Sequence, residues 1–364
     1  MGGGLLGEAR ARLLVSGLGA LLSLAILATA AAAEGGRAST PIVPPLVRVA
    51  APRPMPPDLV TPVIETTTTV KPKPAVKPSR PTSTTTSTTT TLPPPPALAP
   101  APTIPQGKGM WIWEPARTEH GDVTAILARA KAAGLTHIFV RTGSTWDGFQ
   151  NGQFLDQLLP FAHAAGLKVY GWDFPKLSDT KVDVDRALQA LNHTAAGGNR
   201  LDGFAADIET RSEGTDFRAD AAWVYSHYLR DAVGPSTLLI AVVPNPTPQM
   251  RRQYSYDATV GPFDAIAPMV YWLNREPGLD TAVALDYLKH YGKPLMPIGQ
   301  AYDGGPEGGR PGVPTPAELT RFMQVAHDYG AVSVSFWSWQ EANASAWDAI
   351  KAAPLFVKLP ALKS

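Results

Sequence analysis

Two carboxylates stand two residues apart near the middle of the chain, in the segment LDGFAADIET of residues 201–210. In a β-strand, residues i and i+2 point to the same face, with about 6–7 Å between their Cα atoms. Asp207 and Glu209 would then lie side by side among apolar neighbours, where the pKa values of two carboxyl groups separate. One can stay ionised while the other keeps its proton and acts as a general acid. A salt-bridged or helix-capping pair is the alternative, because a helical segment follows.

From residue 107 onward, apolar runs alternate with amphipathic segments. Eight strands are expected, at residues 109–113, 136–142, 167–174, 201–209, 236–244, 263–272, 293–302 and 331–339. Apolar residues at helical spacing occupy the segments between them. The sequence AAGL occurs twice at the end of such a segment, which places Gly134 and Gly166 where a left-handed residue commonly closes a helix.

This alternation predicts an α/β fold, a (β/α)8 TIM barrel over residues 107–364. A doubly wound open sheet is the alternative, but it usually has fewer strands and a glycine-rich phosphate loop after the first of them. The segment WIWEPARTEHG at residues 111–121 contains no such loop. The barrel is therefore the favoured architecture.

In such barrels the active site lies at the C-terminal ends of the strands, so the residues there are site candidates. Aromatic side chains beside carboxylates and amides favour a sugar site, because indole faces stack on pyranose rings while polar groups bind hydroxyls. The predicted substrate-binding residues are Trp113, Arg141, Trp172, Asp173, Asn245, Trp272, Gln300, Trp337 and Trp339. Three further polar residues stand at strand ends, namely Glu114, Asp303 and Gln340. For any single tryptophan, packing in the barrel core or rim is the alternative.

The segment DGFAADIE resembles the strand-four signature D-G-x-D-x-D-x-E of family 18 glycoside hydrolases, the chitinase-type barrels. Asp202, Gly203, Asp207 and Glu209 match the signature, and Ala205 stands in place of its inner aspartate. Supporting likenesses occur on two other strands. The segment 269–271, MVY, resembles the family's M-x-Y-D, with Trp272 in place of the acid, and Trp337 falls where the family has a floor tryptophan. The resemblance covers the barrel alone.

The resemblance implies a role for each matched side chain. Glu209 would protonate the glycosidic oxygen, and Asp207 would orient the 2-acetamido group of the substrate, whose carbonyl attacks the anomeric carbon. Tyr271 would hydrogen-bond that acetamido group, and Trp337 would form the floor of the sugar subsite. The implied substrate is a polymer that contains N-acetylglucosamine, such as peptidoglycan or chitin, and no cofactor is implied.

The departures from the signature suggest altered electrostatics. With fewer neighbouring carboxylates, Asp207 is expected to ionise more readily, and the pKa of Glu209 is expected to rise less. A catalytically inactive carbohydrate-binding barrel is therefore the alternative function. Family 25 muramidases also carry D-x-E at strand four, but they need an aspartate at the end of strand one, where this chain has Glu114. A barrel that acts on something other than sugar is a third class of function. Phosphodiesterase barrels usually need paired His/Glu metal ligands, and the sequence shows no such pairs.

The N-terminal part of the chain has a different composition. Residues 1–36 contain Arg10 and Arg12, an apolar run and the small residues 30–33, which predicts a cleavable signal peptide or a membrane anchor. Residues 37–106 are rich in proline and threonine, which predicts a disordered, extended linker. The expected location is therefore secreted or cell-envelope.

Composition narrows the range of partners. The chain of 364 residues has a formal net charge of +1, which gives no electrostatic case for a nucleic-acid partner. It contains no cysteine, and its seven histidines are scattered, so no metal site is expected. The expected partner is a carbohydrate polymer, with membrane contact only through the possible N-terminal anchor. The oligomeric state is not predicted.

Overall fold

The structure is a computed structural model that describes residues 101–354. The predicted export or anchor segment, residues 1–36, and residues 37–100 of the predicted linker lie outside the described residues. Between residues 101 and 354, no helix is both long enough and apolar enough to cross a membrane.

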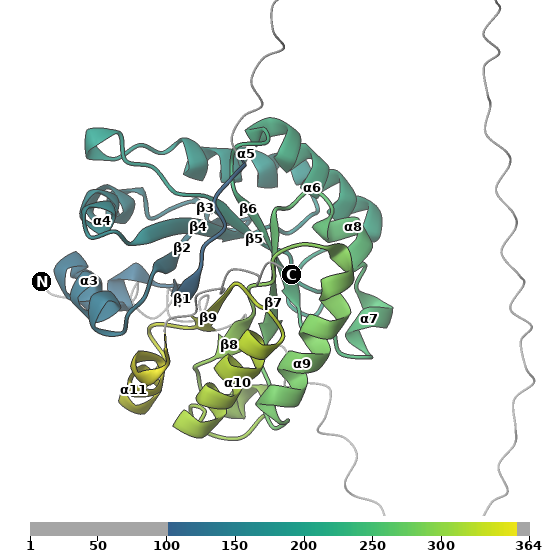
Figure 1. Cartoon of the computed structure of the whole chain (residues 1–364). Coiled ribbons are helices and arrows are strands. Elements are labelled where there is room, and N and C mark those ends of the chain that lie inside the picture. Colours follow the sequence, from purple (N-terminus) through teal and green to yellow (C-terminus); the bar gives the residue numbers. More distant parts are fainter. Residues whose placement is uncertain (1–100, 355–364) are drawn as a thin grey trace, which may run out of the picture. The chain divides into compact units, whose positions relative to one another are not determined.

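Eight parallel strands form a closed barrel (Figure 1). They are β1 (Gly107–Ile112), β2 (His137–Ser144), β4 (Lys168–Phe174), β5 (Phe204–Asp207), β6 (Leu239–Pro244), β7 (Ala265–Val270), β8 (Ile298–Gln300) and β9 (Ser333–Trp337). Each strand pairs with the next, and β1 pairs with both β2 and β9, which closes the barrel. A short strand, β3 (Gly148–Phe149), pairs antiparallel with the end of β2. The predicted (β/α)8 barrel is confirmed.

Helices surround the sheet on its outer side (Figure 1). They are α3 (Val123–Ala132), α4 (Gly152–Ala164), α5 (Thr180–Asn192), α6 (Ala219–Val233), α7 (Met250–Gln253), α8 (Tyr256–Val260), α9 (Pro277–Leu288), α10 (Pro316–Asp328) and α11 (Ala344–Ala352). Short 3-10 turns occur at Pro115–Arg117, Glu119–Gly121, Ala196–Gly198, Lys289–Tyr291 and Gly305–Glu307. As the AAGL sequences predict, Gly134 and Gly166 follow α3 and α4 with φ angles of +67° and +74°.

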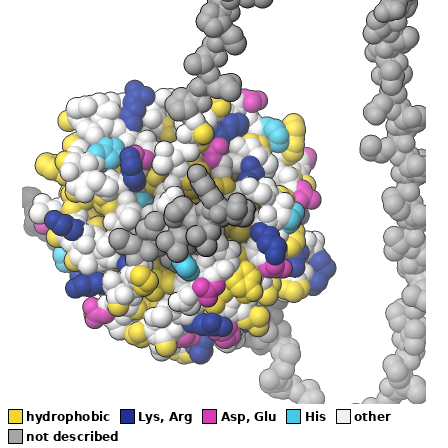
Figure 2. All heavy atoms as spheres, viewed as in Figure 1, with side chains coloured by type: hydrophobic (Ala, Val, Ile, Leu, Met, Phe, Trp, Pro, Cys, Tyr) yellow, Lys and Arg dark blue, Asp and Glu magenta, His cyan; other side chains and the backbone are white. Residues whose placement is uncertain are grey.

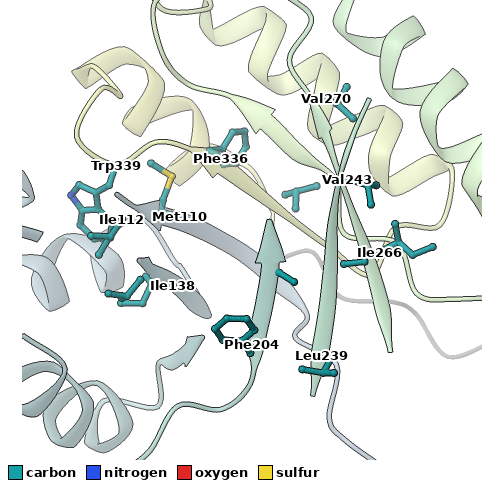
Figure 3. Packing of buried hydrophobic residues seen from close by; sticks show 14 of the residues in the cluster. Met110, Ile112, Ile138, Phe204, Leu239, Val243, Ile266, Val270, Phe336 and Trp339 are labelled. Atoms are coloured by element: carbon teal, nitrogen blue, oxygen red, sulfur yellow. The ribbon is translucent and has the colours of Figure 1, made fainter. Parts of the chain in front are cut away.

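Buried apolar side chains form two layers because successive strand residues point to opposite faces. The outer layer lies between sheet and helices and includes Met110 and Ile112 of β1 (Figure 3). The inner layer fills the barrel and includes Trp111 of the same strand. Lys108, also on β1, is buried, and its Nζ donates hydrogen bonds to the carbonyl of Ile350 on α11 (2.7 Å) and to another just beyond that helix. This lysine ties the last helix to the first strand.

Candidate active site

A cavity of about 460 Å³ opens at the C-terminal ends of the barrel strands. Five of the predicted site residues line it together, namely Asp207, Glu209, Asn245, Tyr271 and Trp337. They come from the ends of β5, β6, β7 and β9, so only the closure of the barrel brings them to one place. This is the end at which barrel enzymes carry their active sites.

The alternation along β5 orients the acid pair. Phe204 and Ala206 pack in the outer layer, whereas Ala205 packs in the inner layer. Asp207 therefore faces the barrel interior, like Ala205. The pattern continues past the end of the strand, where the backbone N–H of Ile208 donates to the carbonyl oxygen of Val242 on β6 (3.1 Å). Asp207 and Glu209 consequently face the same cavity.

Burial controls the ionisation of both acids. Asp207 is 8% exposed, and its Oδ1 has no hydrogen-bond partner among the described residues. Burial raises the pKa of Asp207 to about 7, with smaller contributions from Asp173 and Glu213 and an opposing one from Arg141. Burial also raises the pKa of Glu209 well above its usual value, and the negative charges of Asp207 and Glu213 raise it further. The raised pKa favours the protonated form of Glu209, which is the form that a general acid needs.

The expectation that Ala205 makes Asp207 ionise more readily and the pKa of Glu209 rise less than with the inner aspartate stays a prediction, but burial raises both pKa values in this chain. Ala205 does remove one carboxylate from the interior of the barrel. The dominant cause of the raised pKa values is desolvation, however, and a buried methyl group does nothing to relieve it. Asp173 on the neighbouring strand and Glu213 in the loop after β5 supply further negative charge.

A cluster of tryptophans forms the floor of the cavity. Trp337, at the end of β9, lines the cavity, and its ring contacts Trp172 edge-on at 5.3 Å between centroids. Trp111 also lines the cavity and lies 6.3 Å from Trp337. Trp172 is 3% exposed and donates its indole N–H to the carbonyl of Ile112 (3.2 Å), and half-buried Trp113 packs against Trp337 at 6.3 Å. Trp172 and Trp113 thus support the floor from outside the cavity lining.

Tyr271 also lines the cavity and directly follows β7. Its ring meets that of Tyr302 edge-on at 5.4 Å, and the hydroxyl of Tyr302 donates to Glu307 Oε2 (2.6 Å). Burial raises the pKa of Tyr271 well above its usual value, so its hydroxyl keeps its proton and can donate a hydrogen bond. Asn245, also on the cavity wall, donates from Nδ2 to Asp280 Oδ2 (3.4 Å).

Two predicted binding residues are held in ion pairs beside the cavity. Asp173 is fully buried and accepts a hydrogen bond from Arg186 Nε on α5 (2.7 Å), while burial raises the pKa of Asp173 to about 7. Arg141 pairs with Asp147 (2.8 Å), and its guanidinium lies over the ring of Trp172 at 6.0 Å. Neither side chain lines the cavity. Both influence Asp207 through their charges.

Three predictions of substrate contact need correction, those for Trp272, Gln300 and Trp339. Trp272 is fully buried against Phe322 of α10, because alternation turns it away from the barrel interior that Tyr271 faces. Gln300 is 1% exposed and accepts a hydrogen bond from the backbone N–H of Leu273 (2.8 Å). These two side chains stabilise the barrel wall.

Trp339 lies in the outer layer with Met110 and Ile112 (Figure 3). Its indole N–H donates to Glu119 Oε1 (3.0 Å), and its ring meets that of Trp347 on α11 edge-on. The strand β9 ends at Trp337, so strand alternation does not extend to Trp339. The polar residues Glu114, Asp303 and Gln340 also stay outside the cavity lining.

Among the cavity residues that the sequence-based prediction missed are two acids and a tryptophan. Glu213 and Glu307 come from the loops after β5 and β8, and Trp111 lies two residues before the predicted Trp113. Period-two alternation identifies Trp111, because it shares a strand face with Trp113. The two glutamates occupy loops, where no periodicity indicates the direction of a side chain. No group of three or more His, Asp or Glu side chains within residues 101–354 is arranged to hold a metal ion.

No family model matches the sequence, and no curated protein matches it. Solved structures share its fold. The endo-β-1,4-mannanase from Thermotoga petrophila is similar over 68% of this chain and 75% of its own, with 10% identity and a TM-score of 0.50. The C-terminal domain of a candidate chitinase from Desulfitobacterium hafniense DCB-2 is similar over 68% of this chain and 98% of its own, with 12% identity and a TM-score of 0.50. The chain thus has a closed (β/α)8 barrel fold like those of chitinase-type and other glycoside hydrolase barrels.

Proposed function

We propose that the protein is a glycoside hydrolase of the chitinase type, with Glu209 as general acid. One observation carries the proposal: Asp207, Glu209, Tyr271 and Trp337 line a single open cavity at the catalytic end of the barrel. The arrangement combines a carboxyl group whose pKa is raised by burial, a second carboxyl that faces the same cavity, a hydroxyl donor and an indole ring. Glycoside hydrolases commonly use two carboxyl groups beside the scissile bond, and the hydroxyl and the indole ring are suited to contacts with a sugar.

The proposed reaction uses the substrate's own acetamido group as nucleophile. Glu209 gives its proton to the glycosidic oxygen as the C1–O bond breaks, and the acetamido carbonyl oxygen bonds to C1 to form a cyclic oxazolinium ion. Asp207 and Tyr271 hold the acetamido group in place. The leaving sugar departs, and Glu209, now a carboxylate, takes a proton from the water molecule that attacks C1. The acetamido group is released intact, and Glu209 recovers its proton.

The proposed substrate is a polymer that contains N-acetylglucosamine. The resemblance of 202–209 to the chitinase-type signature supports this choice. A β-1,4-mannan is the competing substrate, since the mannanase from Thermotoga petrophila shares the fold. Mannose lacks the acetamido group, so hydrolysis of mannan would demand a different nucleophile.

The test compares Glu209→Gln with the unaltered protein on fully acetylated chitotetraose, on its deacetylated counterpart and on mannotetraose. Glu209→Gln should lose at least about 100-fold in kcat, because amide nitrogen cannot supply the proton. Glu213→Gln, from the same cavity but outside the strand, is the matched control and should lose less than about tenfold. Undiminished activity in Glu209→Gln would remove the assignment. Binding of these glycans without turnover would instead indicate an inactive carbohydrate-binding barrel.

We also propose that the protein acts outside the cytoplasmic membrane. The apolar segment within residues 1–36 and the proline- and threonine-rich stretch that follows support this location. Fractionation of the producing cells should recover the chain in the medium or envelope. Recovery in the cytosol with residues 1–36 intact would contradict the proposal.

A further inference from the structure

A second hollow, of about 700 Å³, shares its wall with the cavity. Two segments build that wall. In the loop after β5, Ser212 lines the cavity while Arg211 lines the hollow, and on α7 Met250 lines the cavity while Arg251 lines the hollow. Dark-blue side chains lie over the edge of the molecule that carries α7 (Figure 2). The two sites are therefore neighbours separated by single layers of chain.

The hollow gathers arginines whose charge is not neutralised. Thirteen arginines occur within residues 101–354, and nine of them have a carboxylate oxygen within 4.0 Å. The four without such a partner among the described residues are Arg200, Arg211, Arg251 and Arg252. Three of these four line the hollow, together with Arg218. Among the described residues that line it, Asp257 is the one carboxylate.

The fold holds two of these guanidinium groups in place through uncharged carbonyl partners. Arg211 Nε donates to the carbonyl of Phe217 (2.8 Å), and Arg251 Nε donates to the carbonyl of Pro246 (2.6 Å). The Arg251 guanidinium also lies over the ring of Tyr287, 4.1 Å from its centroid. Each group keeps N–H donors for a ligand. Arg252 is exposed, and its guanidinium makes no hydrogen bond to the other described residues.

The cavity has the opposite character. Its described lining includes four carboxyl groups, those of Asp207, Glu209, Glu213 and Glu307, and no lysine or arginine. The described lining therefore offers an anionic substituent no cationic partner. The arginine hollow next to it offers planar donors that match a carboxylate in two-point contacts. The two neighbouring sites thus differ in the charge of the side chains that line them.

We propose that the arginine hollow binds a carboxylate group carried by the glycan, so that the preferred substrate is an acidic glycan and not a neutral one. The proposal rests on the proposed function for the identity of the polymer as a glycan. It adds a specificity site built from Arg211, Arg251 and Arg252. Its ligand is a carboxylate group attached to the sugar chain that occupies the neighbouring cavity.

The test measures binding by calorimetry in a Glu209→Gln background, where turnover is suppressed. The probes are neutral chitotetraose and a tetrasaccharide in which alternate sugars carry a 3-O-lactyl carboxylate. At about 20 mM salt the carboxylated probe should bind at least about tenfold more tightly, as expected for a charge-assisted guanidinium contact. The preference should shrink at about 200 mM salt because the site is open to solvent. A glycerol phosphate polymer tests the other source of negative charge.

Arg252→Gln should reduce the preference to less than about threefold, and Arg252→Glu should abolish it. Arg200→Gln is the matched control, because Arg200 is exposed, lies outside the hollow and has no carboxylate partner among the described residues, and its replacement should leave the preference unchanged. Equal affinity for the two tetrasaccharides, an unchanged preference in Arg252→Glu, or tighter binding of the phosphate polymer would each overturn the proposal. A retained preference in a protein that hydrolyses no glycan would instead defeat the proposed function and leave this site standing.

Discussion

Replacing Asp207 by asparagine tests how burial of this carboxyl group affects the stability of the fold. The side chain is 8% exposed and its Oδ1 lacks a hydrogen-bond partner among the described residues, so little compensates the ionised form for the water it loses. The pKa of Asp207 is about 7 in the folded protein, against an ordinary value of 3.8. Ionising this residue therefore opposes folding.

The sign follows from proton linkage. A carboxyl whose folded pKa is raised stabilises the fold below its unfolded pKa, and that contribution is lost as pH rises through the folded pKa. Three pKa units at about 1.36 kcal/mol each amount to about 4 kcal/mol once the pH exceeds 7. Asparagine does not ionise, so the variant avoids this loss. The unfolding free energy of Asp207→Asn minus that of the unaltered protein should therefore increase by about 2–4 kcal/mol from pH 4 to pH 8. The lower value applies where Asp207 shares a proton with Glu209.

Urea unfolding followed by tryptophan fluorescence at pH 4, 5, 6, 7 and 8 provides the measurement. Asp231→Asn is the matched control, because Asp231 is an exposed aspartate on α6. The informative quantity is the difference between variant and unaltered protein at each pH, since other buried acids titrate in both. Parallel curves for Asp207→Asn and the unaltered protein would refute the argument that burial controls this carboxyl.

Two further predictions concern the frame and the cavity wall. Lys108→Met should lower the unfolding free energy by about 2 kcal/mol, because the carbonyls of Ile350 and Ala353 lose their donor, and urea unfolding at pH 7 checks it. A variant at least as stable as the unaltered protein would show that the lysine does not tie α11 to β1. Tyr271→Phe should reduce kcat/KM on acetylated chitotetraose by about 10–100-fold while changing the unfolding free energy by less than about 1 kcal/mol. Unchanged kcat/KM would show that the hydroxyl does not contact the substrate.

Strand periodicity accounts for what could be predicted from the sequence. Alternating apolar runs and helical segments define the (β/α)8 barrel, and the i, i+2 spacing places Asp207 and Glu209 on one strand face. The same rule excludes Trp272, since it must point away from the side that Tyr271 faces. The prediction failed there because residues at strand ends were selected by type without regard to their face.

Other features depend on contacts between distant segments. The partner of Asp173 is Arg186 on α5, and no local pattern distinguishes a buried ion pair from a ligand contact. Trp339 follows the end of β9, where strand periodicity stops. Glu307 lies in the glycine-rich loop after β8, and its place at the cavity follows from the path of that loop. Each case needs the assembled barrel, because the deciding neighbour comes from another unit of the fold.

The substitution at Ala205 separates two properties that a sequence signature combines. An inner aspartate would add negative charge beside Asp207, yet burial is the largest cause of the raised pKa values of Asp207 and Glu209 without it. Desolvation depends on the closed barrel and the apolar floor below the acids, which Ala205 and Trp111 help to form. Without a carboxylate at position 205, the pKa of Glu209 is still raised well above its usual value. The state of the acid follows from the packing of the inner layer more than from the number of acids in the motif.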